Sequence, residues 1–310
     1  MNAVSTHDAH NGGKAWVSGY HPGELAVQRR MGQEDIAQRV GRMIRADIPA
    51  AAAAFLAEQP MIVVAAADDG GRMWAGQLVG PPGFVHASGE RAIEVEARPK
   101  AGDPLAESLR GTRHVGIIAL QPQLRRRMRV NGVIAPTTTG LHIDTEQVYS
   151  NCPKYISRRG IEEWATGESP TVRRTTALDE PQRQLIARAD AFFVASADVD
   201  GNADASHRGG NPGFLQVLSP TRLRWPDYRG NSMFMTLGNI AADPRCGLLI
   251  PDWRTGTTLQ LTGTAEITWE QAAFTAGAQC AIDFTLIEVV EITNATPLRW
   301  SEPELSPANP

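Results

Sequence analysis

An internal repeat is the feature of this sequence that most constrains its fold. The motif Gly80-Pro81-Pro82-Gly83-Phe84 returns as Gly210-Asn211-Pro212-Gly213-Phe214, 130 positions later. Three more pairs of segments keep the same order at an offset of 130 or 131: residues 61–71 and 191–201, 115–118 and 246–249, and 129–132 and 260–263. Four pairs of similar segments that follow one another in the same order indicate a duplicated domain. Such a chain is expected to form a pseudo-dimer with its functional site where the two copies meet.

Length and charge narrow the class of protein. The 310 residues suffice for about two domains of ordinary size. A net charge of −4 indicates neither a nucleic-acid nor a membrane partner. The longest apolar stretch falls short of the ~20 residues that cross a membrane, and the first residues lack the apolar core of a signal peptide. We therefore expect a cytoplasmic protein.

The cysteines give no sign of a cross-linked or metal-bound framework. Cys152, Cys246 and Cys280 are odd in number and far apart in the sequence. This spacing predicts neither a set of disulfides nor a zinc site, and no metal site is expected elsewhere.

Within each copy, short apolar runs separated by turns predict strands around one crossover helix. The strands expected in the first copy lie near residues 61–65, 73–79, 84–86, 92–97, 115–120 and 125–134, with a helix at 103–110. Those expected in the second copy lie near 191–197, 203–208, 213–218, 222–225, 247–250 and 257–267, with helices at 184–189 and 231–242. This pattern favours a small antiparallel barrel over a sandwich or a βαβ sheet.

The predicted organisation is a mainly β chain with some α-helix, built from two tandem barrels. Residues 1–59 should form a tail and helices, of which 1–22 lack regular structure and the rest break at Pro49. The first barrel is expected at 60–148, a connecting segment at 149–181 and the second barrel at 182–300. The proline-rich residues 301–310 should be a frayed tail.

The two copies differ most in their polar residues. Residues 74–79 of the first copy are largely apolar, whereas the second has Asp204-Ala205-Ser206-His207-Arg208-Gly209. A glycine-bounded turn that leads into a helix can bind an anion through its N–H groups. Such a turn is expected at residues 225–232, where Arg229, Asn231 and Ser232 would add donors and Arg208 could grip a phosphate. The alternative, that Ser232 merely caps the helix, stays open.

Residues 182–300 resemble the pyridoxamine 5′-phosphate oxidase-like FMN-binding split barrel. The segments that carry this resemblance are 195–201, 206–210, 225–231, 239–249 and 259–266, and 239–249 is the most specific of them. The whole chain also resembles a two-barrel subgroup of this family, marked by the segment QVYSNCPKYI at residues 147–156.

The resemblance implies two tandem split barrels with one FMN at their junction, because the first copy lacks the polar cluster. Ser206, His207 and Arg208 would lie on the strand that faces the flavin. Thr258 and Gln260 stand where relatives reach the flavin of the facing barrel, and Arg127 and Arg129 are their counterparts in the first copy. The cofactor-binding residues expected in all are Arg127, Arg129, Ser206, His207, Arg208, Trp225, Pro226, Asp227, Arg229, Asn231, Ser232 and Asn239.

Three residues are candidates for a catalytic role. His207 could transfer protons near neutral pH, or it could be a hydrogen-bonded barrel residue. Lys154 and Tyr155 could line the flavin pocket, or they could pack the connecting segment. Cys152 beside Lys154 could form a reactive thiolate, although packing is the favoured interpretation for this residue.

The expected function is an FMN-dependent oxidoreductase that passes hydride between flavin and a small organic substrate. Its electrons would come from NAD(P)H, a deazaflavin or a partner reductase, and the chain would form a homodimer. The end of the second copy, Pro297-Leu298-Arg299-Trp300, lacks the Arg/His substrate clamp of true pyridoxamine phosphate oxidases, which argues against that substrate. The alternatives are a non-catalytic flavin or haem carrier and a structural pseudo-dimer without a cofactor.

Overall fold

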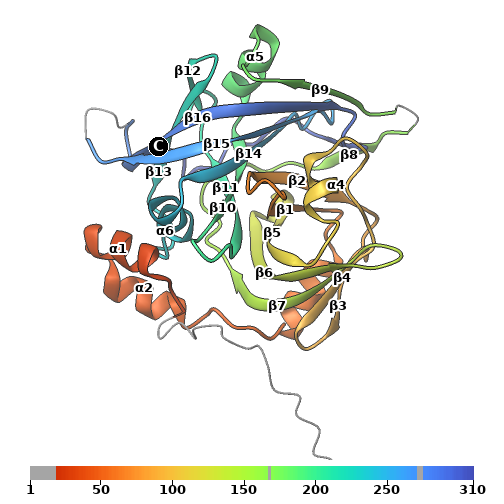
Figure 1. Ribbon diagram of the computed structural model, residues 1–310, viewed down its shortest axis with the longest axis horizontal. Coiled ribbons are helices and arrows are strands. Elements are labelled where there is room, and N and C mark those ends of the chain that lie inside the picture. The colour runs from red at the N-terminus through yellow and green to blue at the C-terminus, as the bar shows by residue number, and fades with distance from the viewer. Residues whose placement is uncertain (1–18, 167–168, 271–274) are drawn as a thin grey trace, which may run out of the picture.

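The computed structural model describes residues 19–166, 169–270 and 275–310, and in these ranges the repeat folds into two sheets of one topology (Figure 1). The first sheet has the order β2-β1-β5-β6-β7-β4-β3 and the second the order β11-β10-β14-β15-β16-β13-β12, with every pair antiparallel. The first-sheet strands are β1 (Met61–Ala67), β2 (Met73–Val79), β3 (Val85–Gly89), β4 (Ala92–Val95), β5 (Arg113–Gln121), β6 (Arg126–Pro136) and β7 (Leu141–Ser150). The second-sheet strands are β10 (Ala191–Ala197), β11 (Ala203–Gly209), β12 (Gln216–Ser219), β13 (Arg222–Tyr228), β14 (Arg245–Pro251), β15 (Thr258–Thr268) and β16 (Ala278–Thr293).

The two sheets have their irregularities at equivalent positions of the repeat. The ladder between β6 and β7 shifts register at Asn131–Gly132, and the ladder between β15 and β16 shifts at Thr262–Gly263, 131 positions later. A crossover helix follows the fourth strand of each sheet, α4 (Pro104–Ser108) in the first and α6 (Met235–Ala242) in the second. The expected fold class, two tandem split barrels, is confirmed.

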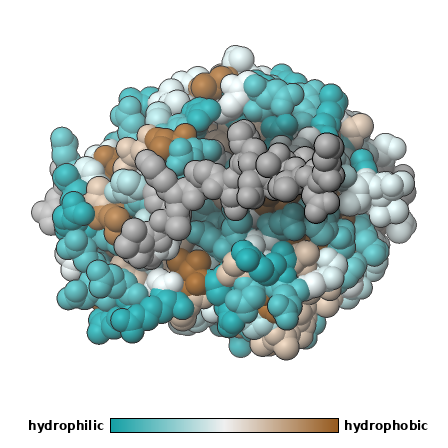
Figure 2. All heavy atoms as spheres, turned by 60° about the horizontal axis from the view of Figure 1, so that its bottom comes forward, coloured by the Kyte–Doolittle hydropathy of each residue, from teal (hydrophilic) through white to brown (hydrophobic). Residues whose placement is uncertain are grey.

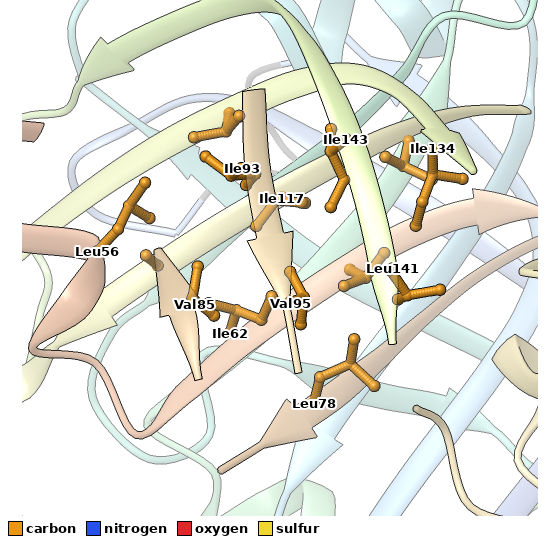
Figure 3. Close-up of a cluster of buried hydrophobic side chains, with 14 of the residues drawn as sticks. Leu56, Ile62, Leu78, Val85, Ile93, Val95, Ile117, Ile134, Leu141 and Ile143 are labelled. Atoms are coloured by element: carbon orange, nitrogen blue, oxygen red, sulfur yellow. The ribbon is translucent and has the colours of Figure 1, made fainter. Parts of the chain in front are cut away.

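Each barrel has its own apolar core. The first core gathers side chains from all seven strands of its sheet and from Leu56, as Figure 3 shows. The second core is centred on Trp225, which contacts Phe192 edge-on with 5.4 Å between ring centroids. Aromatic pairs in this arrangement stabilise a core beyond the area they bury.

A third core joins the barrels. Successive residues of β1 point to opposite faces, so that Ile62 and Val64 enter the first barrel while Met61 and Val63 pack against the second. This double burial explains why residues 61–66 are apolar without alternation. Phe193 takes the place of Val63 in the other copy and packs in the same shared core.

Two glycines allow this close approach. A Cβ atom on Gly116 would lie 2.5 Å from the backbone of Asp204 and Ala205, and one on Gly247 would lie 2.5 Å from the carbonyl oxygen of Met73. Both glycines occupy the same position of the repeat. The pseudo-dimer interface is therefore pseudo-symmetric in its backbone contacts.

Three helices precede the first barrel: α1 (Pro22–Arg30), α2 (Glu34–Gly41) and α3 (Ala50–Ala57). His21 caps α1, and its backbone N–H in turn donates to the Glu24 carboxylate at 2.8 Å, which forms a capping box. Helix α1 lies against α6 of the second barrel, with Glu24 beside Gly238 (Figure 1). Tyr20 is buried and donates to the Ala37 carbonyl oxygen, so the expected lack of structure is wrong for residues 19–21, while residues 1–18 lie outside the described ranges.

The connecting segment and the C-terminal tail also pack on the barrels. Strand β8 (Ile161–Trp164) pairs with β17 (Leu298–Trp300), and β9 (Thr171–Thr175) pairs with β16. The remaining elements are the turn η1 (Pro122–Leu124) and helix α5 (Glu180–Arg188). The tail is not frayed as expected, because the backbone of Glu304 pairs with that of Arg158 and Ser306 is buried.

The surface is mainly polar on the face drawn in Figure 2. Figure 2 shows one hydrophilic face on which apolar residues gather only in small patches. In the ranges that the structure describes, every helix is too short or too polar to cross a bilayer.

Candidate functional site

Strand β6 of the first barrel faces β11 of the second, and this junction brings together residues expected from both copies. Met128 and Val130 point into the first barrel, which turns Arg129 toward the second. The Arg129 guanidinium lies 2.9 Å from the Asp204 carboxylate and donates to the Tyr149 hydroxyl at 3.1 Å. It also donates to the Ser206 hydroxyl. Arg129 and Ser206 thus meet as expected, but they bind each other within the protein.

Arg127 lies on the same face of β6 and contacts the second barrel at His207. Its Nη1 atom is 2.9 Å from His207 Nδ1, and its Nε donates to the Cys152 carbonyl oxygen at 3.0 Å. Burial, and then repulsion by Arg129 and Arg208, lower the pKa of Arg127 to about 9. Among the described residues Arg127 forms no ion pair with a carboxylate, so its charge is compensated only by neutral acceptors.

His207 is a neutral side chain in this environment. It is buried, and burial together with Arg127 and Arg208 holds its pKa well below the usual value. Because arginine can only donate, Nδ1 must accept from Arg127 and the ring proton is assigned to Nε2. His207 therefore acts here as a neutral partner of Arg127, not as a cation.

Arg208 adds a third cation to the junction. It lies 3.3 Å from Asp227, whose pKa is raised by burial even though Arg208 opposes that shift. Two carboxylates, Asp204 and Asp227, thus face three guanidinium groups. An excess of positive charge in a poorly hydrated place is stabilised by a bound anion.

The connecting segment covers this junction. The Tyr155 carbonyl oxygen lies so close to β11 that a Cβ on Gly209 would approach it to 1.9 Å. The Tyr155 hydroxyl donates to the Arg229 carbonyl oxygen at 3.0 Å, and its ring packs on Tyr228. Lys154 is exposed beside it, while Cys152 contributes its carbonyl group and not its thiol to Arg127.

Other expected residues have different neighbours. Trp225 is fully buried in the second core instead of lining a flavin cleft, and Pro226 is buried beside it on β13. The Ser232 hydroxyl donates to Gln33 at 2.6 Å, because the turn between α1 and α2 covers this loop. Ser232 is therefore not the N-cap of α6, a position that Phe234 holds without a side-chain bond.

The remaining donors of the expected phosphate turn are also engaged or remote. Asn231 accepts from the backbone N–H of Met233, and Arg229 is exposed at the end of β13. Asn239 donates to the Ser196 hydroxyl at 3.0 Å and lies 2.9 Å from His21. The structure thus brings together Arg127, Arg129, Ser206, His207, Arg208, Asp227 and Tyr155, but not Trp225, Asn231, Ser232 or Asn239.

Arg127 also lines a cavity of about 870 Å³ on the first-barrel side of the junction, whose walls come from residues 42–55 and 124–153. Its walls are apolar at Met43, Phe55 and Met128, and the lining also includes the guanidinium-bearing residues Arg42, Arg45, Arg125, Arg126 and Arg127. Arg45 pairs with Asp47 and Arg125 with Glu304, whereas Arg126 stacks over the Phe55 ring at 4.9 Å. Of these five arginines, only Arg127 is among the cofactor-binding residues expected from the sequence.

A second cavity of about 610 Å³ lies at the pseudo-symmetric position, where the first copy was expected to have no site. It is lined by Gln77 of β2 and by Thr258 and Gln260 of β15, the repeat counterparts of His207, Arg127 and Arg129. Neither this cavity nor the cavity beside Arg127 is lined by Ser206, His207 or Arg208. The side chains that fill the junction in one copy are replaced in the other by open space.

Acidic groups gather in a third cavity, of about 760 Å³, between α1 and the two barrels. Burial raises the pKa of Glu24 to about 8, with Asp204 and Asp198 adding to the shift. Burial also lowers the pKa of His21. Neither residue is among those expected at the site, and the structure gives both a capping role at the start of α1.

A match to a known protein family falls on the second barrel. Residues 178–289 match the family model described as pyridoxamine 5′-phosphate oxidase. The second barrel belongs to the pyridoxamine 5′-phosphate oxidase-like split-barrel family. A comparison with curated protein sequences gives no match.

Several solved structures are similar to part of this chain. A putative pyridoxamine 5′-phosphate oxidase from Lactobacillus delbrueckii is 22% identical over 37% of this chain and 94% of its own, with a TM-score of 0.32. A general stress protein 26-related protein of the pyridoxinephosphate oxidase family from Clostridium acetobutylicum is 14% identical, over 38% and 89%, with a TM-score of 0.30. A FAD-binding protein from Mesorhizobium loti is 12% identical, over 40% and 99%, with a TM-score of 0.26.

Proposed function

We propose that this protein is an FMN-dependent oxidoreductase that binds one flavin at the junction of its two barrels. The observation that supports this function is the Arg127 guanidinium. It touches His207 of the second barrel and has no carboxylate partner among the described residues, and Arg127 also lines a cavity of about 870 Å³ with apolar and basic walls. A cation without a counter-ion beside such a cavity suits a ligand that joins a phosphate to an aromatic ring.

The residues at this junction fit the two ends of such a ligand. Arg127 would bind the phosphate, and Arg42 on the same cavity wall would add a second cation. Phe55 and Met128 would contact the ring and exclude water from it. The volume lies within the ~300–1,000 Å³ of small-molecule sites.

His207 would position the phosphate-binding group. Its Nδ1 atom accepts from Arg127 and so fixes the direction of the guanidinium. When bound, the flavin would supply reversible hydride transfer with a small organic substrate, while the protein supplies binding, orientation and exclusion of solvent. NAD(P)H, a deazaflavin or a partner reductase would be the electron donor, and a protein base is not required.

The test is the flavin content of purified protein and its affinity for added FMN. Arg127→Met should lower that affinity by about a hundredfold, the effect of losing a charge-assisted phosphate contact of roughly 3 kcal/mol. Arg229→Met should retain it, because Arg229 is exposed at the end of β13 and outside the cavity. Full FMN affinity in Arg127→Met, or no affinity in the unsubstituted protein, would overturn the proposed site.

Absorbance spectra separate the oxidoreductase from the alternatives. A bound flavin band that bleaches with NAD(P)H supports the enzyme, whereas a flavin that no donor reduces supports a carrier. A Soret band after addition of haem, without affinity for FMN, would instead favour a haem-binding protein. A protein that binds neither would be a structural pseudo-dimer.

A further inference from the structure

The cavity of about 610 Å³ on the other side of the pseudo-dimer has buried oxygen atoms without hydrogen-bond partners. Gln77 Oε1, Thr258 Oγ1 and Gln260 Oε1 line it, and none of the three has a partner among the described residues. Thr258 and Gln260 are each only 1% exposed. Buried polar atoms are almost always paired, so three unpaired ones on one wall indicate a missing ligand.

The orientation of Gln260 is fixed by its other end. Its Nε2 donates to Asp103 Oδ2 at 3.0 Å, and Asp103 in turn caps α4 by accepting from the Leu105 N–H at 2.9 Å. Reversing the amide would place its oxygen against a carboxylate oxygen. The Gln260 carbonyl oxygen is therefore the end of the amide that is left without a partner beside the cavity, and it can only accept a hydrogen bond.

The same cavity is lined by three basic residues and by two carboxylates, Asp103 and Glu163. Arg98, Lys100 and Arg299 line it, and in the described ranges none of the three forms an ion pair. Lys100 donates to the Asn294 carbonyl oxygen at 3.1 Å and Arg299 to the Thr296 carbonyl oxygen at 2.7 Å. Their positive charges are thus available to an anion at the mouth of the cavity.

We propose that this cavity binds a small anionic polyol, such as a sugar phosphate, separately from the flavin. Hydroxyl groups of the ligand donate to the oxygens of Gln77, Thr258 and Gln260. The anionic group lies at the rim beside Lys100 and Arg299. The repeat thus provides two different sites. One is basic and centred on Arg127. The other is this cavity, whose floor, formed by Gln77, Thr258 and Gln260, accepts hydrogen bonds.

The first experiment measures binding of ribose 5-phosphate, ribose, ribonate and inorganic phosphate by titration calorimetry. Ribose 5-phosphate should bind at least tenfold more tightly than ribose or phosphate alone, because it engages both floor and rim. Ribonate distinguishes a carboxylate from a phosphate as the preferred anion. Equal affinity for phosphate and ribose 5-phosphate would reduce the site to an anion contact, and no binding of any probe would overturn the proposal.

Thr258→Val tests the floor without changing its shape. Because the hydroxyl has no partner to lose, the melting temperature without ligand should stay constant or rise, while affinity for ribose 5-phosphate should fall about tenfold, the effect of one hydrogen bond. A structural role for the hydroxyl would instead lower the melting temperature. Unchanged affinity in Thr258→Val would contradict the assigned floor.

Lys100→Gln tests the rim against Arg110→Gln, an equal loss of charge at an exposed residue outside the cavity. Lys100→Gln should lower the affinity for ribose 5-phosphate and leave the affinity for ribose unchanged. Arg110→Gln should change neither affinity. FMN affinity of Thr258→Val is measured in parallel. If this variant keeps its affinity for FMN, the two sites are distinct. If it loses that affinity, the cavity belongs to the flavin site and the proposal is overturned.

Discussion

Glu24 shows how the setting of one side chain makes stability depend on pH. Its carboxyl is buried between α1 and α6, and its pKa rises from 4.5 to about 8. The folded state therefore holds a proton that the unfolded state releases, and the stabilisation present below pH 4.5 is lost as the pH rises toward 8.

Glu24→Gln should remove this dependence. The free energy of unfolding of the unsubstituted protein should fall between about pH 5 and pH 8, and that of the variant should fall less steeply. Urea unfolding at several pH values measures both. Glu34→Gln, at an exposed position of α2, serves as the control, and parallel pH profiles for Glu24→Gln and the unsubstituted protein would contradict the assignment.

Arg159 and Asp190 form a buried ion pair outside both proposed sites. Their side chains are almost fully buried and meet at 2.6 and 2.9 Å through two parallel hydrogen bonds. Arg159→Met leaves the Asp190 carboxylate without its partner, which should cost roughly 3–5 kcal/mol of stability. Denaturant unfolding checks this value, and a loss below about 1 kcal/mol, typical of exposed pairs, would contradict it.

The residue-level predictions from sequence succeeded where one strand sets the direction of a side chain. The alternation of arginine and apolar residues along 127–130 is visible in the sequence, and the structure places Met128 and Val130 in the first core and Arg127 and Arg129 at the junction. Alternation could not separate Trp225 from a site residue, because an aromatic residue suits a barrel core and a cofactor wall equally well. The contact of Ser232 could not be predicted for another reason: its partner Gln33 is 199 positions away, and no local pattern reveals that contact.

Among the elements, most strands of the two barrels were predicted closely and two were missed. β1, β2, β10 and β11 agree with the expected ranges within two residues, since Asp-Gly turns mark where each hairpin reverses. β7 (Leu141–Ser150) and β16 (Ala278–Thr293) were not predicted. Their alternating residues carry the signal, but each contains several charged side chains that resemble a surface loop.

The C-terminal tail is the element whose removal should change the junction most. Glu304 pairs with Arg158 through the backbone, and Ser306 accepts from the Tyr155 N–H at 3.2 Å. Deletion of residues 301–310 should lower the melting temperature and speed proteolysis between residues 151 and 158. Limited proteolysis followed by mass spectrometry locates the cleavage, and cleavage confined to other loops would contradict this role of the tail.

At the scale of the whole molecule, the shared core should make the two barrels unfold together. Gly247→Val places a side chain where a Cβ already meets the Met73 backbone at 2.5 Å, so the interface must separate to accept it. Calorimetry should show one transition in the unsubstituted protein and a lower melting temperature in the variant. Two resolved transitions in the unsubstituted protein would show instead that the barrels unfold independently.

The expected homodimer remains a prediction about the whole molecule. In this chain, the third core already buries the faces of β1, β5, β10 and β14 that join the two copies. A homodimer would therefore need a different surface. Light scattering coupled to size-exclusion chromatography gives the mass in solution and decides between one chain and two.

Covalent linkage of the two copies changes what a single mutation can do. In an assembly of identical subunits every substitution is made twice, so both clefts gain or lose a group at once. Here Arg127 and Thr258 are encoded separately, although they hold the same place in the repeat. One cleft can therefore be altered by selection while its counterpart keeps its original chemistry.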